Sequence, residues 1–186
     1  DACRNGRLSS LPRMGERRSQ AILEAIQRHR ARRTPRLLLP RAVSYADSIC
    51  AKLRKVPGVR RAEAAGSVRR RKETVGDLDV LVAAVEPQAA VRAFCELADV
   101  ATVVARGPTK ASVRLHVGLQ VDLRVLPPES FGAALHYFTG SKAHNVAIRT
   151  RAVHRGLKVS EYGVFDREGL RLGGAREEEG FTGVGV

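Results

Sequence analysis

No stretch of the chain is apolar over anything like the ~20 residues that a bilayer-spanning helix needs, so we expect no membrane segment. The first residues are polar and lack the apolar core of a secretory signal, and the absence of an initiating Met suggests a processed chain or a fragment. Cysteine is scarce: Cys3, Cys50 and Cys95 are too few and too widely spaced for a disulfide framework or a zinc cluster. This scarcity favours a reducing, cytoplasmic compartment. The histidines show no metal-ligand spacing, and we expect His136 to be a structural residue of a helix.

Positive charge, in contrast, is abundant and unevenly distributed. The net charge is +14, and residues 1–72 hold 20 Lys and Arg against five Asp and Glu, whereas residues 73–186 hold 13 against 14. A basic half beside a nearly neutral half predicts a surface that binds a polyanion. Arginine dominates the basic half, which favours bidentate contacts with phosphate. The alternative is a solvated run of charge without a partner.

Two carboxylates two residues apart are the most informative feature of the sequence. Asp77 and Asp79 lead into the apolar run Val80-Leu81-Val82, which predicts a β-strand on which both aspartates point to one face. Like charges held side by side need a cation between them, and hard oxygen ligands suit Mg²⁺. The turn Gly66-Ser67 and the arginines after it supply donors for phosphate. Together these residues predict a nucleotidyl-transfer site.

A third carboxylate lies on a second strand. Residues 119–126 alternate between apolar and less apolar positions, which predicts a half-buried strand with Asp122 and Arg124 on its less apolar face. If this strand pairs beside the first, three carboxylates converge and can hold two divalent ions about 3.5–4 Å apart. The alternative is that Asp122 is a surface residue of an amphipathic strand.

The pattern of elements predicts an α/β (α+β) fold with a mixed, mostly antiparallel sheet. Residues 1–40 hold a turn ending at Gly15, a helix to about residue 26 and a basic linker over residues 28–36. Residues 41–128 form the sheet domain, with helices over 40–56 and 86–98 and strands over 62–65, 100–105, 111–117 and 119–126.

Residues 129–186 form a second, smaller α/β subdomain. A helix over 129–138 is followed by a helix from Ser141 as N-cap to about Arg155, with Gly156 as C-cap, and then by a β segment over 157–165. The tail from residue 173 has little to bury, and we expect its end to be loose or truncated.

Two motifs resemble those of a known family. Gly66-Ser67 with Arg69-Arg70, followed by Asp77-Leu78-Asp79, resembles the nucleotidyltransferase signature of family X DNA polymerases, the polymerase beta group. Residues 137–141, Tyr-Phe-Thr-Gly-Ser, with Asn145 and Arg149 after them, resemble the nucleotide-binding thumb motif of that group. This second motif is what distinguishes polymerases from other nucleotidyltransferases. Residues 106–114 and 127–132 resemble the bacterial members in particular.

The resemblance implies a role for each matching residue. The metal ligands and catalytic residues would be Asp77, Asp79 and Asp122, holding two Mg²⁺ ions, with Mn²⁺ as an alternative. The nucleotide would be bound by residues of both motifs: Gly66, Ser67, Arg70, Gly76, Tyr137, Phe138, Gly140 and Asn145. The DNA would be bound by the basic half and one thumb residue: Gly15, Arg28, Arg30, Arg32, Arg33 and Arg149. Arg124, which would pair with a catalytic Asp in the open site, and Glu161 would support the site.

The resemblance therefore implies a DNA-directed DNA polymerase with a nucleotidyltransferase palm at 41–128, a thumb-like subdomain at 129–186 and a helical DNA-binding segment at 1–40. It would add dNMP from dNTP to a primer 3′ end on gapped or primer–template DNA, as a monomeric, nucleoid-associated bacterial repair protein without membrane contact. Arg71 and Arg13 depart from the family, which has glycine there. The family's N-terminal lyase domain and the C-terminal phosphoesterase domain of bacterial members are absent, so we expect a core fragment. The alternatives are a non-templated transferase acting on RNA ends or a small molecule, and an inactive DNA-binding palm.

Overall fold

The computed structural model describes residues 15–31 and 36–179, and the chain divides into two units, residues 1–34 and 35–186. In the first unit, helix α1 spans Glu16–Ala31. The carbonyl of Gly15 accepts hydrogen bonds from the backbone N–H groups of Arg18 and Ser19, at 3.0 and 3.1 Å, and so begins the helix. The prediction ended this helix near residue 26 and is too short, because no glycine or proline interrupts residues 27–31.

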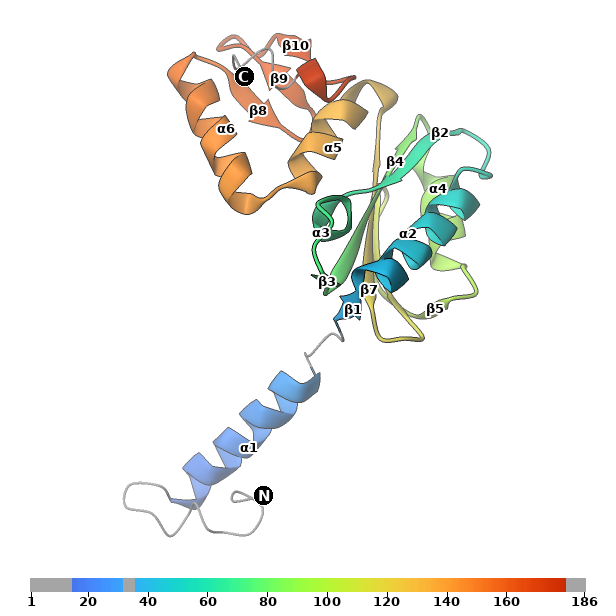
Figure 1. Cartoon of the computed structure of the whole chain (residues 1–186), viewed down its shortest axis with the longest axis vertical. Coiled ribbons are helices and arrows are strands. Elements are labelled where there is room, and N and C mark those ends of the chain that lie inside the picture. Colours follow the sequence, from blue (N-terminus) through green and yellow to red (C-terminus); the bar gives the residue numbers. More distant parts are fainter. Residues whose placement is uncertain (1–14, 32–35, 180–186) are drawn as a thin grey trace. The chain divides into compact units, whose positions relative to one another are not determined.

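The second unit contains a five-stranded sheet in the order β2-β4-β7-β6-β5 (Figure 1). Its strands are β2 Val59–Ala64, β4 Asp77–Ala84, β5 Val100–Arg106, β6 Lys110–Leu115 and β7 Gln120–Leu126. The central pair β4 and β7 is parallel, and the other pairs are antiparallel. This arrangement confirms the predicted mixed, mostly antiparallel sheet, with strand ends that differ from the predicted ones by a few residues.

Two helices cover one face of this sheet. They are α2 Leu39–Leu53 and α4 Pro87–Cys95, each with a proline in its first turn. Both are shorter than predicted: α2 ends before residue 56 and α4 before residue 98. Their apolar faces join the buried side chains of one sheet face, including Val80 and Val82, in the main core. The alternate residues of the same strand, Leu81 and Ala83, point to the opposite face and a second core.

The helix that covers this opposite face begins the C-terminal part of the chain. After the single turn η1 Pro128–Ser130, α5 spans Phe131–Thr139 and packs its buried residues on Leu81 and Ala83. Helix α6 spans Lys142–His154, and its N-cap Ser141 accepts a hydrogen bond from the His144 backbone N–H at 3.3 Å, as predicted. Gly156 follows the helix with a φ of 73°.

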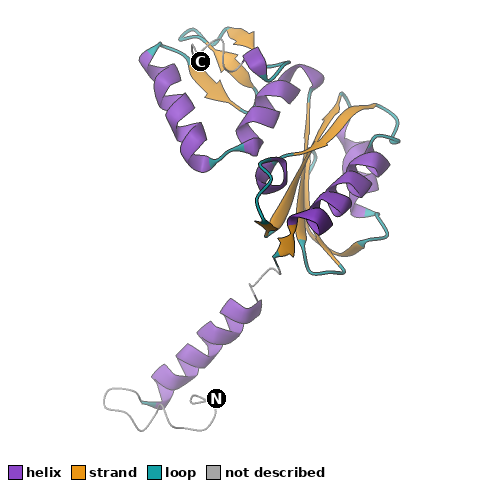
Figure 2. Ribbon diagram, in the orientation of Figure 1, coloured by secondary structure: helices purple, strands orange, loops and turns teal. Residues whose placement is uncertain are grey.

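The predicted β segment over residues 157–165 is a hairpin rather than one strand. Strands β8 Lys158–Ser160, β9 Gly163–Phe165 and β10 Arg171–Gly173 form a separate, three-stranded antiparallel sheet (Figure 2). Ile148 and Ala152 of α6 pack on Val159 and Val164 in a third core. The division of residues 35–186 at residue 128 stays a prediction.

The tail is better ordered than the sequence predicts as far as residue 179, where the description ends. Gly174 is buried, and its carbonyl accepts a hydrogen bond from the Ala133 N–H at 2.9 Å. The Glu179 carboxylate in turn accepts from the Gly174 N–H at 2.7 Å. The expectation that the tail has little to bury was wrong for residues 173–179, because acidic side chains of the tail stabilise its backbone turn. The predicted loose or truncated end lies outside the described residues. Among the helices of the described ranges, none has the length and apolarity to span a bilayer.

One backbone conformation generates a stability prediction. Arg71 has a φ of 56° and is the one described non-glycine residue with a positive φ. This left-handed conformation is disfavoured by about 1–2 kcal/mol for a residue with a side chain. We expect Arg71→Gly to raise the free energy of unfolding by roughly 0.5–1 kcal/mol, measured by urea denaturation. Lys72→Gly, which removes the same charge one residue later, should lower it. An equal decrease in the free energy of unfolding in both variants would contradict the backbone strain inferred at Arg71.

Candidate active site

The register of the two central strands brings the predicted carboxylates together. In the parallel pair of β4 and β7, Asp79 lies opposite Asp122, and Asp77 lies opposite Gln120. Because side chains two residues apart on a strand share a face, all three carboxylates lie on the same side of the sheet. The structure confirms the prediction that these two strands are neighbours in the sheet.

Asp79 has the most perturbed carboxyl group of the three. Its pKa is raised from 3.8 to about 6, first by burial and then by the charges of Asp77 and Asp122, while Arg124 and Arg70 act in the opposite direction. A cation placed among these carboxylates would reverse the perturbation. The oxygen donors are those that Mg²⁺ prefers, so the residues fit such an ion.

Asp122 is held by its neighbours. Its carboxylate accepts hydrogen bonds from the Ser112 hydroxyl and from Gln120 Nε2, the latter at 3.1 and 3.2 Å. In the ranges that the structure describes, no group of three or more His, Cys, Asp or Glu side chains is close enough to enclose an ion. The geometry therefore supplies a pair of facing carboxylates and a third exposed one, Asp77, rather than a closed metal cage.

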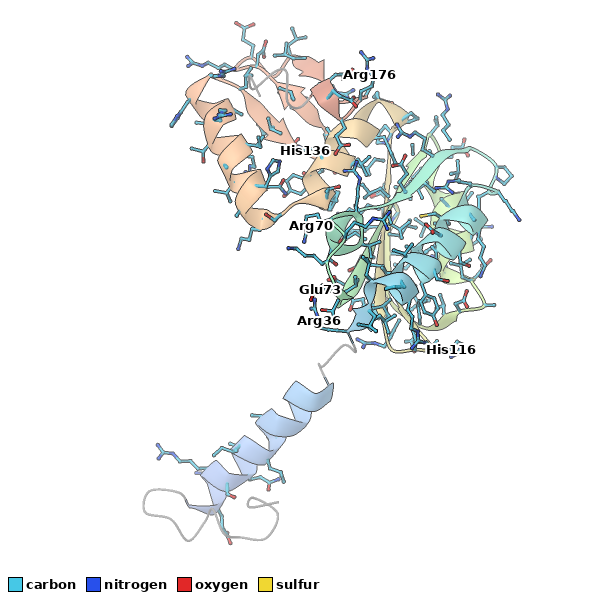
Figure 3. The ribbon with its side chains drawn as sticks, viewed as in Figure 1. Arg36, Arg70, Glu73, His116, His136 and Arg176 are labelled. Atoms are coloured by element: carbon cyan, nitrogen blue, oxygen red, sulfur yellow. The ribbon has the colours of Figure 1, made fainter. Side chains whose placement is uncertain are left out.

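The predicted Gly-Ser turn is a single helical turn, α3 Gly66–Arg69, that lies against the carboxylates. Gly66 has a φ of 59°, and a Cβ there would collide with Oδ2 of Asp79, so only glycine fits. Ser67 Oγ and Arg70 Nε are both buried and have no hydrogen-bond partner. The Arg70 guanidinium also donates to the Thr139 carbonyl, which links α3 to the end of α5 (Figure 3).

The opposite wall comes from α5 and α6. Tyr137 and Phe138 end α5 and stack edge to face, with ring centroids 5.2 Å apart. Asn145 Nδ2 donates to the Tyr137 carbonyl at 2.6 Å, and Asn145 Oδ1 is buried without a partner. Gly140 has a φ of 70° and a cis peptide bond to Ser141, and it approaches the Arg70 guanidinium.

An open cavity of about 420 Å³ lies between these walls. Its lining combines the sheet carboxylates, the α3 turn and the two C-terminal helices: Gly66, Ser67, Arg70, Asp77, Asp79, Tyr137, Phe138, Gly140, Lys142, Asn145, Val146 and Arg149. Three of the lining residues carry the buried atoms without partners, namely Ser67, Arg70 and Asn145. Because buried polar groups are normally hydrogen-bonded, these atoms are candidate donors and acceptors for a ligand bound in the cavity.

Other predicted residues lie beside the cavity. Gly76 packs against the guanidinium of Arg36, which donates to Thr74. Arg124 stacks its guanidinium on the Phe138 ring, 4.8 Å from the centroid, and its charge lowers the pKa of Asp79. Its pairing with a catalytic aspartate in the open site stays a prediction. Glu161 lines a separate cavity together with Tyr137 and Arg149.

Only some of the predicted DNA-binding residues near the N-terminus lie in the described part of the structure. Arg28 and Arg30 lie within α1, not in a linker as predicted, and their side chains are outside the description. Arg32 and Arg33 lie outside the described residues altogether, as does Arg13. Gly15 precedes α1.

Sequence reasoning missed several residues of the site. Lys142 and Val146 line the cavity, and they share a face of α6 with Asn145 and Arg149 at helical spacing. This helical spacing was the sequence signal that could have identified Lys142 and Val146 as site residues. Arg69 was identified as part of the nucleotidyltransferase signature, but no role in the site was predicted for it.

Arg69 also connects the α3 turn to the C-terminal tail. Its two terminal nitrogens each donate to Glu177 at 2.7 Å, and one also donates to the Thr139 hydroxyl at 2.8 Å. Glu177 lies more than 100 residues away in the sequence, and no local pattern identifies it as the partner.

Comparison with known proteins relates the chain to DNA polymerases. Residues 134–186 match the family model for the DNA polymerase beta thumb. Over 166 residues the chain is 35% identical to a protein of Bacillus subtilis (strain 168) named DNA polymerase/3′-5′ exonuclease PolX. The similar region covers 88% of this chain and 29% of that protein, so the chain spans less than a third of the length of this relative.

The raised pKa of Asp79 predicts a pH-dependent stability effect in metal-free buffer. Because the folded pKa of about 6 exceeds the ordinary 3.8, this group favours folding below pH 3.8 and loses that contribution as the pH rises through 6. Asp79→Asn mimics the neutral form, so it should stabilise the chain by about 2 kcal/mol near pH 8 and by much less near pH 4. Denaturant titrations at both pH values measure this, with the exposed Asp47→Asn as control. A difference in stability that does not change with pH would contradict the raised pKa of Asp79.

Proposed function

Because the chain belongs to the family X DNA polymerases, we propose that it adds deoxynucleotides to a primer 3′ end under the direction of a template. The observation that carries this proposal is the convergence of three features on one cavity: the carboxylates of Asp77 and Asp79, with Asp122 in register beside Asp79, cationic phosphate donors, and residues that carry buried polar atoms without partners. A phosphoryl-transfer site needs charge stabilisation and alignment more than covalent chemistry, and these features supply both.

The α3 turn is suited to a triphosphate. Ser67 Oγ and Arg70 Nε are donors that a phosphate oxygen would satisfy, and the next donor, Lys142, lines the same cavity. Gly66 lets the turn lie directly against Asp79, so phosphates bound here would lie beside the carboxylates. Gly76, kept close to Arg36 by its lack of a side chain, would leave room for the phosphates on the approach to Asp77.

Asp77, Asp79 and Asp122 would hold the divalent ions that such a reaction uses. Bound Mg²⁺ would supply neutralisation of the charge that develops on the phosphates and a lower pKa for the primer hydroxyl. The chain's own contribution is to keep Asp79 and Asp122 in fixed register on buried strands, with Ser112 and Gln120 orienting Asp122.

The wall formed by α5 and α6 would receive the sugar and base. The Tyr137 and Phe138 rings and the backbone at Gly140 form a surface that would exclude a 2′-hydroxyl by van der Waals contact. Asn145 Oδ1, buried without a partner, would bond to the edge of the base. Arg149 is exposed on the rim of the cavity and would contact the template strand.

The wider biology is proposed on the same basis. DNA would follow the basic half of the chain, residues 1–72, including Gly15 and the arginines of α1. Gap filling in DNA repair by a monomer in the bacterial cytoplasm fits a reducing environment and a cationic surface. The exonuclease in the name of the Bacillus protein belongs to that protein and is not proposed for this chain.

The decisive test is single-nucleotide extension on a one-nucleotide gap, with all four dNTPs and one rNTP in Mg²⁺. We expect only the templated dNTP to be added, and we expect Asp122→Asn to lower the rate by at least about 100-fold while DNA affinity changes little. Asp99→Asn, which alters an exposed carboxylate paired with Lys52, is the matched control. Untemplated addition, or preference for ATP or CTP on an RNA end, would replace this proposal with the non-templated transferase. Normal DNA binding without any extension would favour the inactive palm.

Arg149 provides a second test of template reading. Its loss should reduce discrimination between correct and incorrect nucleotides, and kcat/KM for the correct one, by roughly 10-fold, because one charge contact that aligns the template disappears. DNA affinity, measured by fluorescence anisotropy, should fall less than 3-fold, because only about one phosphate contact is lost. Arg151→Ala, on the same helix but outside the cavity lining, should leave discrimination intact. Equal effects of the two substitutions would show that Arg149 acts only through net charge.

A further inference from the structure

Helices α5 and α6 form one wall of the nucleotide cavity, yet they bury their apolar side chains in different cores. Phe131, Ala134 and Leu135 of α5 pack on the five-stranded sheet. Ile148 and Ala152 of α6 pack on β8 and β9. Among the described residues no apolar cluster is common to the two helices, so hydrogen bonds contribute much of what fixes their mutual position.

Side-chain contacts in the described residues join these helices. One is the bond from Asn145 Nδ2 to the Tyr137 carbonyl. The other joins two histidines that immediately precede those residues: His136 Nε2 and His144 Nε2 are 3.2 Å apart, with the rings edge to face at 80°. His136, labelled in Figure 3, is only 4% exposed. Neither histidine lines the cavity, and the proposed reaction uses neither.

We propose that His136 and His144 are positioning residues: their imidazole–imidazole hydrogen bond locks α6 onto α5, holds the nucleotide wall in its binding geometry, and opens in acid. This inference rests on the proposed function for its consequence on nucleotide binding, but the lock itself is a property of the fold.

The chemistry of the pair sets its response to protons. A bond between two Nε2 atoms requires one ring to donate and the other to accept, so at least one ring must be neutral. A single extra proton is tolerated, because one charged ring can donate to the other, neutral ring. A second proton places two N–H donors and two positive charges face to face, and the contact is lost.

The surroundings of the pair determine where that loss occurs. Burial and the neighbouring His144 lower the pKa of His136 below its ordinary 6.5. From the elements packed around it, the Glu177 carboxylate raises this pKa and the Arg69 guanidinium lowers it, and these two groups are paired with each other. Because the folded pKa is lowered, the stabilising contact is complete above pH 6.5 and is lost as the pH falls through the lowered value.

Substitutions at His144 separate the lock from a merely structural role. His144→Gln keeps an N–H donor toward His136 Nε2 but does not titrate. His144→Leu has similar volume and no hydrogen bond. The matched control is His154→Gln, on an exposed position at the C-terminal end of the same helix.

The binding experiment uses the whole chain, a dideoxy-terminated primer and dATP opposite thymine, at about pH 8 and about pH 5.5. We expect His144→Leu to weaken dATP binding about 5- to 30-fold at pH 8, the usual effect of leaving one buried partner without its bond. Wild type should show a weakening of at least about 5-fold on going to pH 5.5. His144→Gln should bind dATP as tightly as wild type at pH 8. At pH 5.5 its binding should weaken less than that of wild type, because the contribution of the histidine pair to the acid effect is removed.

Titration of Asp79 affects all variants alike, so the difference between wild type and His144→Gln isolates the histidine pair. Two results would overturn the proposal: an acid response of His144→Gln identical to that of wild type, or normal dATP affinity of His144→Leu at pH 8. A response of His154→Gln like that of His144→Gln would overturn it too.

A second measurement does not depend on polymerase activity. Amide hydrogen exchange of α5 and α6 in the chain without DNA or nucleotide should accelerate about 5-fold or more in wild type below pH 6, beyond the intrinsic pH effect, and not in His144→Gln. If no variant binds dATP at any pH, the proposed function fails while this measurement still decides on the lock. Unchanged protection in wild type would reject the lock and leave the polymerase proposal standing.

Discussion

The parallel pairing of β4 with β7 is the constraint on which the candidate site depends, because it sets Asp79 directly against Asp122. Burial, and then the charges of Asp77 and Asp122, raise the pKa of Asp79, so the ionised carboxylate is unfavourable in this position. The arrangement persists because both strands lie inside the sheet, with apolar side chains packed on each face. The cores therefore hold in place a charge arrangement that a flexible segment would avoid, and a cation turns this unfavourable arrangement into a binding site.

The α3 turn transmits this constraint to the rest of the cavity. Gly66 packs against Asp79, while Arg69 and Arg70 on the same turn bond to Thr139 and, through Glu177, to the tail. Apolar packing holds α5 on the sheet and α6 on β8 and β9, but the two helices share no apolar cluster in the described residues, so polar contacts join them to each other. Such contacts respond to pH and salt more than apolar packing does. The geometry of the cavity is for this reason more adjustable than the sheet beneath it.

Regular patterns in the sequence predicted the elements whose stability is local or follows a simple period. The alternation over residues 119–126 predicted β7, and the cap residues Ser141 and Gly156 predicted both ends of α6. Predictions were wrong where local signals were weak: α1 continues through residues 27–31, and the tail folds back as far as residue 179. The carboxylates of the tail find their partners only after the chain has folded, so its composition indicated a loose end.

The sequence by itself determined the chemistry of the site. Asp77 and Asp79 share a face because the period of a strand is two, and Gly66 and Ser67 form a turn because of their small side chains. Only the tertiary structure decided which groups meet. Strand register selected Asp122 as the partner of Asp79, helix packing brought residues of α6 to the cavity, and burial left polar atoms there without partners. The reason is physical: periodicity and turn preference act over a few residues, whereas register, burial and electrostatic repulsion depend on segments that are distant in the chain.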